Sequence, residues 1–243
     1  MNSDPAINTD VLVAADAAWL CGLLQAGDSF YPTGSYAHSF GLEGLVQLNV
    51  IRDRATLREF ILGSVLPSLE QAELPLALHA WRALGEMDWR MIGELSVLSS
   101  ALKTSREARV ASENIGRQRA ELIVALRPTG LGREFMTQAA AGQWPFSASI
   151  SAALEGRVLG SSRIAVTSGI TYATLAATVS AAMKLLRLGQ NASQSLLTEA
   201  LREAPRIITA AESVTFDEIG WFNPWLDIAA ARHETADSRM FIS

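Results

Sequence analysis

Apolar residues recur at the three- to four-residue spacing of an amphipathic helix along nearly the whole chain of 243 residues. Strict alternation of apolar and polar residues, the pattern of a half-buried strand, is nearly absent. The spacing predicts helices over residues 11–26, after 56, after 88, 104–126, 170–187, 193–203 and 206–213, and from the segment FNPW to about 235. We therefore expect an all-α protein, a bundle of about ten helices in a single domain over residues 1–243, with residues 1–9 and about 236–243 as mobile tails.

Several predicted helix ends carry residues that favour them. Gly27 is placed to end the first helix. The segment Thr56-Leu57-Arg58-Glu59 fits a capping box, and Asp88 is placed to cap the following helix. Pro67 is expected to kink or break its helix, because proline lacks an amide hydrogen and its ring clashes with the preceding turn.

Composition and charge exclude several classes of protein. The net charge is −5, and no cluster of lysine and arginine with interleaved aromatic residues is present, which argues against nucleic-acid binding. The segment MNSDPAINTD lacks the basic region and apolar run of a signal peptide. The single cysteine, Cys21, is expected to be a small apolar core residue in a reducing compartment. We therefore expect a cytoplasmic protein.

The longest uncharged window, Ile164 to Met183, is long enough to span a bilayer. It also contains four threonines, two serines and a glycine, which are weakly favoured in a membrane. We expect this window to be a helix buried inside protein, and we expect no membrane association.

Candidate chemistry gathers in the segment DSFYPTGSYAHSFGLEG, residues 28–44, which holds one of three histidines and two of three tyrosines. Within it, AHSFG resembles the elbow of a serine hydrolase with Ser39 as nucleophile. That elbow needs a strand before it and a helix after it. The preceding YPTGSY reads as a turn, so a serine hydrolase is the disfavoured alternative.

Metal and docking sites are the two other interpretations of residues 28–44. His38 has no second histidine near it, and Glu43 lies five residues on, which is not a metal-ligand spacing. We therefore expect no metal site and no cofactor. A helix that begins near Ser35 places Tyr36 and Glu43 on one face, while glycines leave room for another backbone, so the segment fits a docking surface.

Four segments resemble, in order, the motifs of the UreF family of urease accessory proteins. They are LLQAGDSFYPTGSYAHSFGLEG at 23–44, TSREARVASENIGR at 104–117, LLRLGQNASQSLL at 185–197 and ARHETADSRMFIS at 231–243. The first and last of these are long and specific. The resemblance covers nearly the whole chain.

The resemblance implies a non-catalytic, all-α protein that acts as a dimer. Members of the family bind the scaffold protein UreD, also called UreH, and recruit the nickel-carrying GTPase UreG. The assembly docks on apo-urease, where GTP hydrolysis is coupled to nickel delivery. The alternative to a role in urease maturation is a helical adaptor that serves a different metalloenzyme.

The resemblance also implies where partners bind. The candidate partner-binding residues are Tyr36, His38, Ser39, Glu43, Arg106, Arg109, Arg117, Gln190, His233, Glu234 and Arg239. Arg239 is the leading candidate, because a planar guanidinium on a mobile tail can be ordered by a partner carboxylate or carbonyl. Arginines can also stabilise charge during phosphoryl transfer, so Arg106, Arg109, Arg117 and Arg239 are candidates for stimulating the GTPase.

Overall fold

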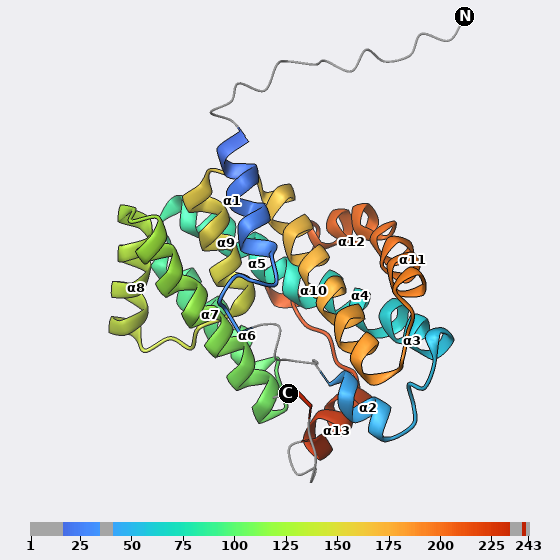
Figure 1. The fold of residues 1–243 in the computed structure, drawn as a ribbon. Coiled ribbons are helices and arrows are strands. Elements are labelled where there is room, and N and C mark those ends of the chain that lie inside the picture. Colours follow the sequence, from blue (N-terminus) through green and yellow to red (C-terminus); the bar gives the residue numbers. More distant parts are fainter. Residues whose placement is uncertain (1–16, 35–40, 234–239, 242–243) are drawn as a thin grey trace, which may run out of the picture.

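A computed structural model describes residues 17–34, 41–233 and 240–241. The described residues form helices and turns and contain no strand, which confirms the predicted all-α class. The elements are α1 Ala17–Gly27, α2 Leu42–Gln47, α3 Arg54–Phe60, η2 Ile61–Val65, α4 Leu66–Ser68, η3 Leu69–Glu73, α5 Leu74–Glu86, α6 Trp89–Ala101, α7 Arg106–Leu126, α8 Gly130–Gly142, α9 Ala148–Leu159, α10 Arg163–Leu185, α11 Gln190–Leu201, α12 Ala204–Ala211, η4 Phe216–Glu218 and α13 Pro224–His233. Figure 1 shows α8 and α11 at opposite sides of the bundle, with α10 running between them.

The segments α3 to α5 form one continuous helical rod from residue 54 to residue 86, so Pro67, where a kink or a break was predicted, does not break the helix. The rod contains two π turns, η2 and η3, each of which ends two residues before a proline. In each turn an amide donates to the carbonyl five residues back, from Leu66 to Ile61 and from Leu74 to Leu69. The wider turn accommodates a proline ring where an α turn would clash, so the helix continues.

Side-chain caps fix several helix starts. Asp53 is the cap of α3: its carboxylate accepts the amide of Thr56 at 2.9 Å, while the Thr56 hydroxyl oxygen accepts the amide of Asp53. The capping box therefore lies one turn earlier than predicted, with Thr56 as its third residue. Asp88 caps α6 as predicted, through the amide of Met91 at 3.0 Å. Gly27 ends α1 as predicted.

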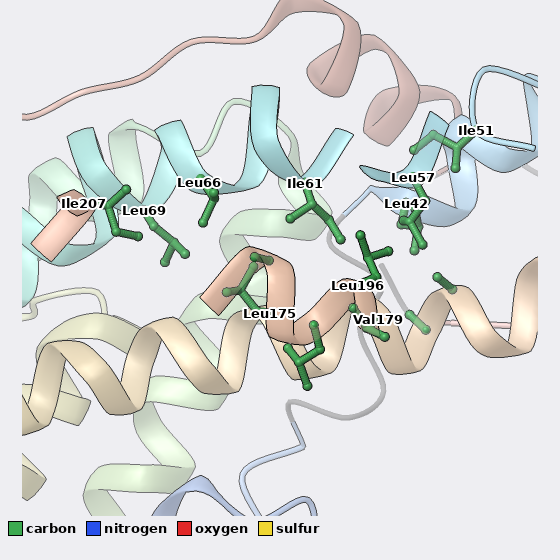
Figure 2. Close-up of a cluster of buried hydrophobic side chains, with 14 of the residues drawn as sticks. Leu42, Ile51, Leu57, Ile61, Leu66, Leu69, Leu175, Val179, Leu196 and Ile207 are labelled. Carbon is green, nitrogen blue, oxygen red and sulfur yellow. The ribbon is translucent and has the colours of Figure 1, made fainter. Parts of the chain in front are cut away.

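The larger hydrophobic cluster lies between the rod, α10, α11 and α12. Leu57, Ile61, Leu66 and Leu69 of the rod are at most 1% exposed, and Figure 2 shows them facing Leu175 of α10 across the cluster. These side chains are spaced four, five and three residues apart, and the five-residue step from Ile61 to Leu66 is the π turn η2, which keeps them on one stripe.

The second cluster lies among α5, α6, α7, α8 and α9. Helices α7 and α9 approach closely because Gly116 carries no side chain: a Cβ at this position would stand 2.6 Å from the Ser147 carbonyl oxygen. Nearby, the Ser112 hydroxyl accepts the amide of Ala148 at 3.3 Å. Ile170 of α10 packs against both clusters, so the two cores are continuous.

Helix α10 is, among the described residues, the helix long and apolar enough to cross a membrane. Only 39% of its apolar window is buried, but its neighbours are α1, α2, α5, α9, α11 and α12. Helix α10 therefore packs against the other helices of the bundle, but its burial is partial, whereas a helix buried inside the protein was predicted.

Helix α1 differs from its prediction in one respect. Cys21 was expected in the core, but its side chain is exposed. The buried face of α1 carries Gly22 and Ala26, and Leu24 on the opposite face is 67% exposed. The residues before Ala17, including the predicted start at residue 11, lie outside the described part of the chain.

Candidate partner interface

The described residues include five of the predicted partner-binding side chains. These five are Glu43, Arg106, Arg109, Arg117 and Gln190. Tyr36, His38, Ser39, Glu234 and Arg239 lie outside the described residues, and His233 ends α13 with its side chain outside the described set.

Glu43 binds the C-terminal segment of its own chain. Its Oε1 accepts the amide of Met240 at 2.8 Å and its Oε2 accepts the amide of Phe241 at 3.0 Å. Glu43 is 4% exposed, and Phe241 is 6% exposed and packs into the larger cluster. In this structure the Glu43 side chain is therefore buried and engaged with its own chain, and residues 240–241 pack against the helical bundle. We call this arrangement the Glu43 latch.

The glycines beside Glu43 allow α13 to pack closely on α2, as predicted. A Cβ at Gly44 would lie 2.6 Å from the carbonyl oxygen of Ala229. Gly41 has a φ of 84°, and a Cβ there would lie 2.6 Å from Leu226 Cδ1. Since glycine adopts this left-handed conformation without strain, the short helix α2 can start directly against α13.

Exposed apolar side chains accompany the Glu43 latch. Trp225 and Ile228 of α13 are 73% and 46% exposed, Phe222 just before α13 is 68% exposed, and Met240 beside the latch is 61% exposed. Large apolar residues gathered near one end of a protein are typical of partner-binding surfaces. Figure 1 shows α2 and α13 side by side at this end of the bundle.

The predicted arginine face of α7 divides into inward and outward positions. Arg109 donates to the carbonyl oxygens of Lys103 and Thr104 at 2.9 and 3.3 Å, so it caps the chain entering its own helix. Arg106 is exposed, and Arg117 is exposed with its guanidinium 5.5 Å from the centre of the Phe146 ring. Gln190 lies on another element, as the exposed first residue of α11.

A buried cluster around Glu155 was not found by sequence reasoning. Glu155 is 1% exposed and accepts the Tyr31 hydroxyl at 2.7 Å, Arg119 Nη1 at 2.7 Å and Arg127 Nη1 at 3.5 Å. Arg127 also donates to Gln25 at the end of α1, at 2.7 Å. Burial raises the pKa of Tyr31 to about 12, with the Glu155 carboxylate adding to the effect.

The Glu155 cluster positions the start of the first motif. The Tyr31 hydroxyl donates to the Glu155 carboxylate of α9, and Arg127, which also pairs with Glu155, donates to Gln25. These contacts hold the turn that follows α1 against α7. A single acidic residue in the run SISAALEGRVLG, which is mostly small and apolar residues, was the available sequence signal. Such a carboxylate is buried only when it is paired.

A second, half-buried ion pair joins Glu73 of η3 to Lys103 at 3.0 Å. Ser149 of α9 also donates to the Glu73 carboxylate. Burial alone would raise the pKa of Glu73, but Lys103 and these hydrogen bonds outweigh it and hold the pKa below its ordinary value. Glu73 is therefore a carboxylate in the folded protein at neutral pH.

The catalytic alternatives gain no support from the described part of the chain. Residues 31–34, ahead of Ser39, form bends, and the strand required by a nucleophile elbow is absent from the described residues. In the same residues, no group of three or more histidine, cysteine, aspartate or glutamate side chains is arranged to hold a metal ion.

Known proteins resemble this chain over nearly its full length. A family model described as UreF matches residues 51–201. A urease accessory protein UreF of Chromohalobacter salexigens is 32% identical over 98% of this chain and 100% of its own length. The UreF proteins of Bacillus sp. strain TB-90 and of Rhodopseudomonas palustris are each 27% identical, over 92% and 100% of this chain and 99% and 100% of their own lengths.

Proposed function

Because the chain belongs to the UreF family of urease accessory proteins, we propose that it bridges the scaffold UreD (UreH) and the GTPase UreG in the complex that delivers nickel to apo-urease. In this proposal the protein is a cytoplasmic, non-catalytic adaptor that acts as a homodimer and uses residues 1–243 as one domain. Neither nucleic acid nor membrane is a partner, and the protein holds no cofactor or metal of its own.

The Glu43 latch is the observation that carries the proposal. It joins the first and last motifs, which are separated by nearly the whole chain, into one surface through two hydrogen bonds to a buried carboxylate. The exposed Trp225, Ile228 and Met240 supply apolar area beside it. We assign the scaffold UreD to this surface. Further candidate contacts, from the same first and last motifs of the sequence, are Tyr36, His38, Ser39, His233, Glu234 and Arg239.

The GTPase is assigned to the exposed arginines of α7. Arg106 and Arg117 are exposed, whereas Arg109 is engaged with backbone carbonyls and is the weaker candidate for acting on a nucleotide. Alanine substitution of Arg106, Arg109, Arg117 and Arg239, one at a time, tests this by the GTP turnover of UreG in the complex. Unchanged turnover in all four variants excludes a stimulating arginine.

The scaffold assignment is tested by co-purification of UreD with a Trp225→Ala, Ile228→Ser variant. Loss of a buried aromatic anchor commonly costs more than about 2 kcal/mol, so we expect binding to weaken by at least about tenfold. Val97→Ser on α6 is the matched control, because Val97 is 57% exposed and belongs to a different element. Equal binding of the two variants and the parent protein contradicts the assignment.

The function itself is tested in cells that carry the urease operon with and without this gene at limiting nickel. Loss of urease activity while the urease subunits accumulate supports the proposal. Unchanged activity, with no second copy present, favours an adaptor for a different metalloenzyme. Light scattering of the purified protein tests the dimer separately.

A further inference from the structure

A cavity of about 230 Å³ lies between the rod, α7, α9, α10 and α13. Most of its wall is apolar and includes Phe60, Ile115, Ile170 and Leu226. Small side chains on three helices leave the space open: Ala108 of α7, Ala148 and Ala152 of α9, and Ala173 and Ala177 of α10. An apolar cavity of about 150 Å³ holds benzene, so this one has room for a small aromatic or branched molecule.

Both π turns of the rod contribute to the wall of this cavity. The turn η2 supplies Ser64 and Val65, and the turn η3 supplies Leu69 and Glu73. A π turn adds one residue to a helical turn and so changes the direction in which nearby side chains point, and such turns occur frequently at functional sites. The departure of the rod from α-helical geometry therefore coincides with the cavity.

Two hydroxyl groups on the wall, those of Ser68 and Thr174, make no hydrogen bond within the described residues. Other hydroxyls there are used, because Ser149 donates to Glu73 and Thr178 donates to a backbone carbonyl. The polar atoms that are both inaccessible and unpaired belong, among the described residues, to Trp81, Arg119 and Ser151, so the Ser68 and Thr174 hydroxyls are accessible. Each can donate and accept a hydrogen bond from a molecule in the cavity.

The charged groups of the wall favour a neutral occupant. Glu73 and Arg119 both contribute to the wall, and each is engaged in an ion pair, with Lys103 at 3.0 Å and with Glu155 at 2.7 Å. The Glu73 carboxylate would repel an anion. An ion of either sign would also lose its hydration in a mainly apolar space, which costs far more than burying a neutral molecule.

We propose that this cavity binds a small neutral molecule with an aromatic or branched apolar body and one hydroxyl group. The apolar body packs among Leu69, Ile115 and Ile170, and the hydroxyl group forms a hydrogen bond with Ser68 or Thr174. This site goes beyond the proposed role in nickel delivery and does not depend on it.

The test is titration of the full chain with phenol, followed by calorimetry and ligand-observed NMR. Toluene has nearly the same shape without the hydroxyl group, and benzoate carries a negative charge. We expect saturable binding of phenol and of toluene, and no binding of benzoate at the same concentration. Absence of saturable phenol binding at about 10 millimolar, beyond the weak end of specific affinities, overturns the proposal. Binding of benzoate as tight as that of phenol also overturns it.

Two variants locate the site. Ser68→Ala combined with Thr174→Val should weaken phenol binding by about two- to tenfold, the contribution of one neutral hydrogen bond, and leave toluene binding unchanged. Ala173→Leu should abolish binding of both compounds by filling the cavity, whereas Ala125→Leu, at an exposed position of α7 away from the cavity, should have no effect. Unchanged phenol binding in the double variant, or in a folded Ala173→Leu protein, overturns the proposal. If Ala173→Leu does not fold, the double variant still decides, because it changes the side-chain volumes little.

Discussion

Replacing Glu43 by glutamine should loosen the C-terminal segment while leaving the helical bundle intact. Glu43 accepts two backbone amides, at 2.8 and 3.0 Å, and is nearly inaccessible to water. Glutamine keeps one acceptor oxygen, so one of these two bonds and the negative charge are lost. A hydrogen bond to a charged group contributes roughly 1.5–3 kcal/mol. Because 1.4 kcal/mol corresponds to a factor of ten, the opened fraction of the segment should rise about 10- to 100-fold.

Hydrogen exchange measures this opening directly. In the parent protein the amides of Met240 and Phe241 should exchange slowly, and in the Glu43→Gln variant their exchange should accelerate by the same factor. Glu59→Gln is the control, because Glu59 is an exposed carboxylate on α3. Amides of the rod should be unaffected in both variants. Equal exchange at Met240 and Phe241 in the variant and the parent would falsify the latch.

Three further predictions address the buried polar groups and the helix contacts. The pKa of Tyr31 is raised in the folded protein to about 12. Its contribution to stability should therefore be complete below pH 10, the ordinary pKa of tyrosine, and be lost as the pH rises through 12. Absorbance titration should show one tyrosine that ionises at higher pH than the others, and this tyrosine should be absent in Tyr31→Phe. Gly44→Ala should destabilise the α2–α13 contact by roughly 1–3 kcal/mol, since a Cβ would stand 2.6 Å from the Ala229 carbonyl oxygen, and an unchanged melting temperature contradicts this. Lys103→Met should cost roughly 1.5–3 kcal/mol at pH 7, because the half-buried Glu73 carboxylate loses its charged donor, and acidification should restore part of that loss. A destabilisation that is independent of pH argues against the pairing.

In the parent protein, the stability contributed by the ion pair between Glu73 and Lys103 falls on acidification, which is opposite to the effect of acid on Lys103→Met. Because the folded-state pKa of Glu73 is lowered, its contribution to stability is present above the ordinary pKa of glutamate. That contribution is lost as the pH falls through the folded-state value. Parent and Lys103→Met proteins should therefore differ less in stability at acid pH than at neutral pH.

The helices and several of their ends could be predicted from the sequence. Apolar spacing is a local signal, and each cap is satisfied within a few residues, as Asp88 is by the Met91 amide. The close-approach glycines were also predictable, because Gly41 and Gly44 have no other evident use in a helical motif. At Pro67 the sequence predicted a kink or a break, whereas in the structure the helix continues through a π turn.

Which polar side chains bind groups of the protein itself depends on tertiary packing and could not be predicted from the sequence. Glu43 and Arg109 look like surface residues in sequence, yet each satisfies backbone groups of its own chain. Glu155 looks incidental, yet it holds α1, α7 and α9 together through partners up to 124 positions away. The reason is physical: a buried charge must find its counterpart wherever the fold brings one, and that pairing is set by packing rather than by spacing along the chain.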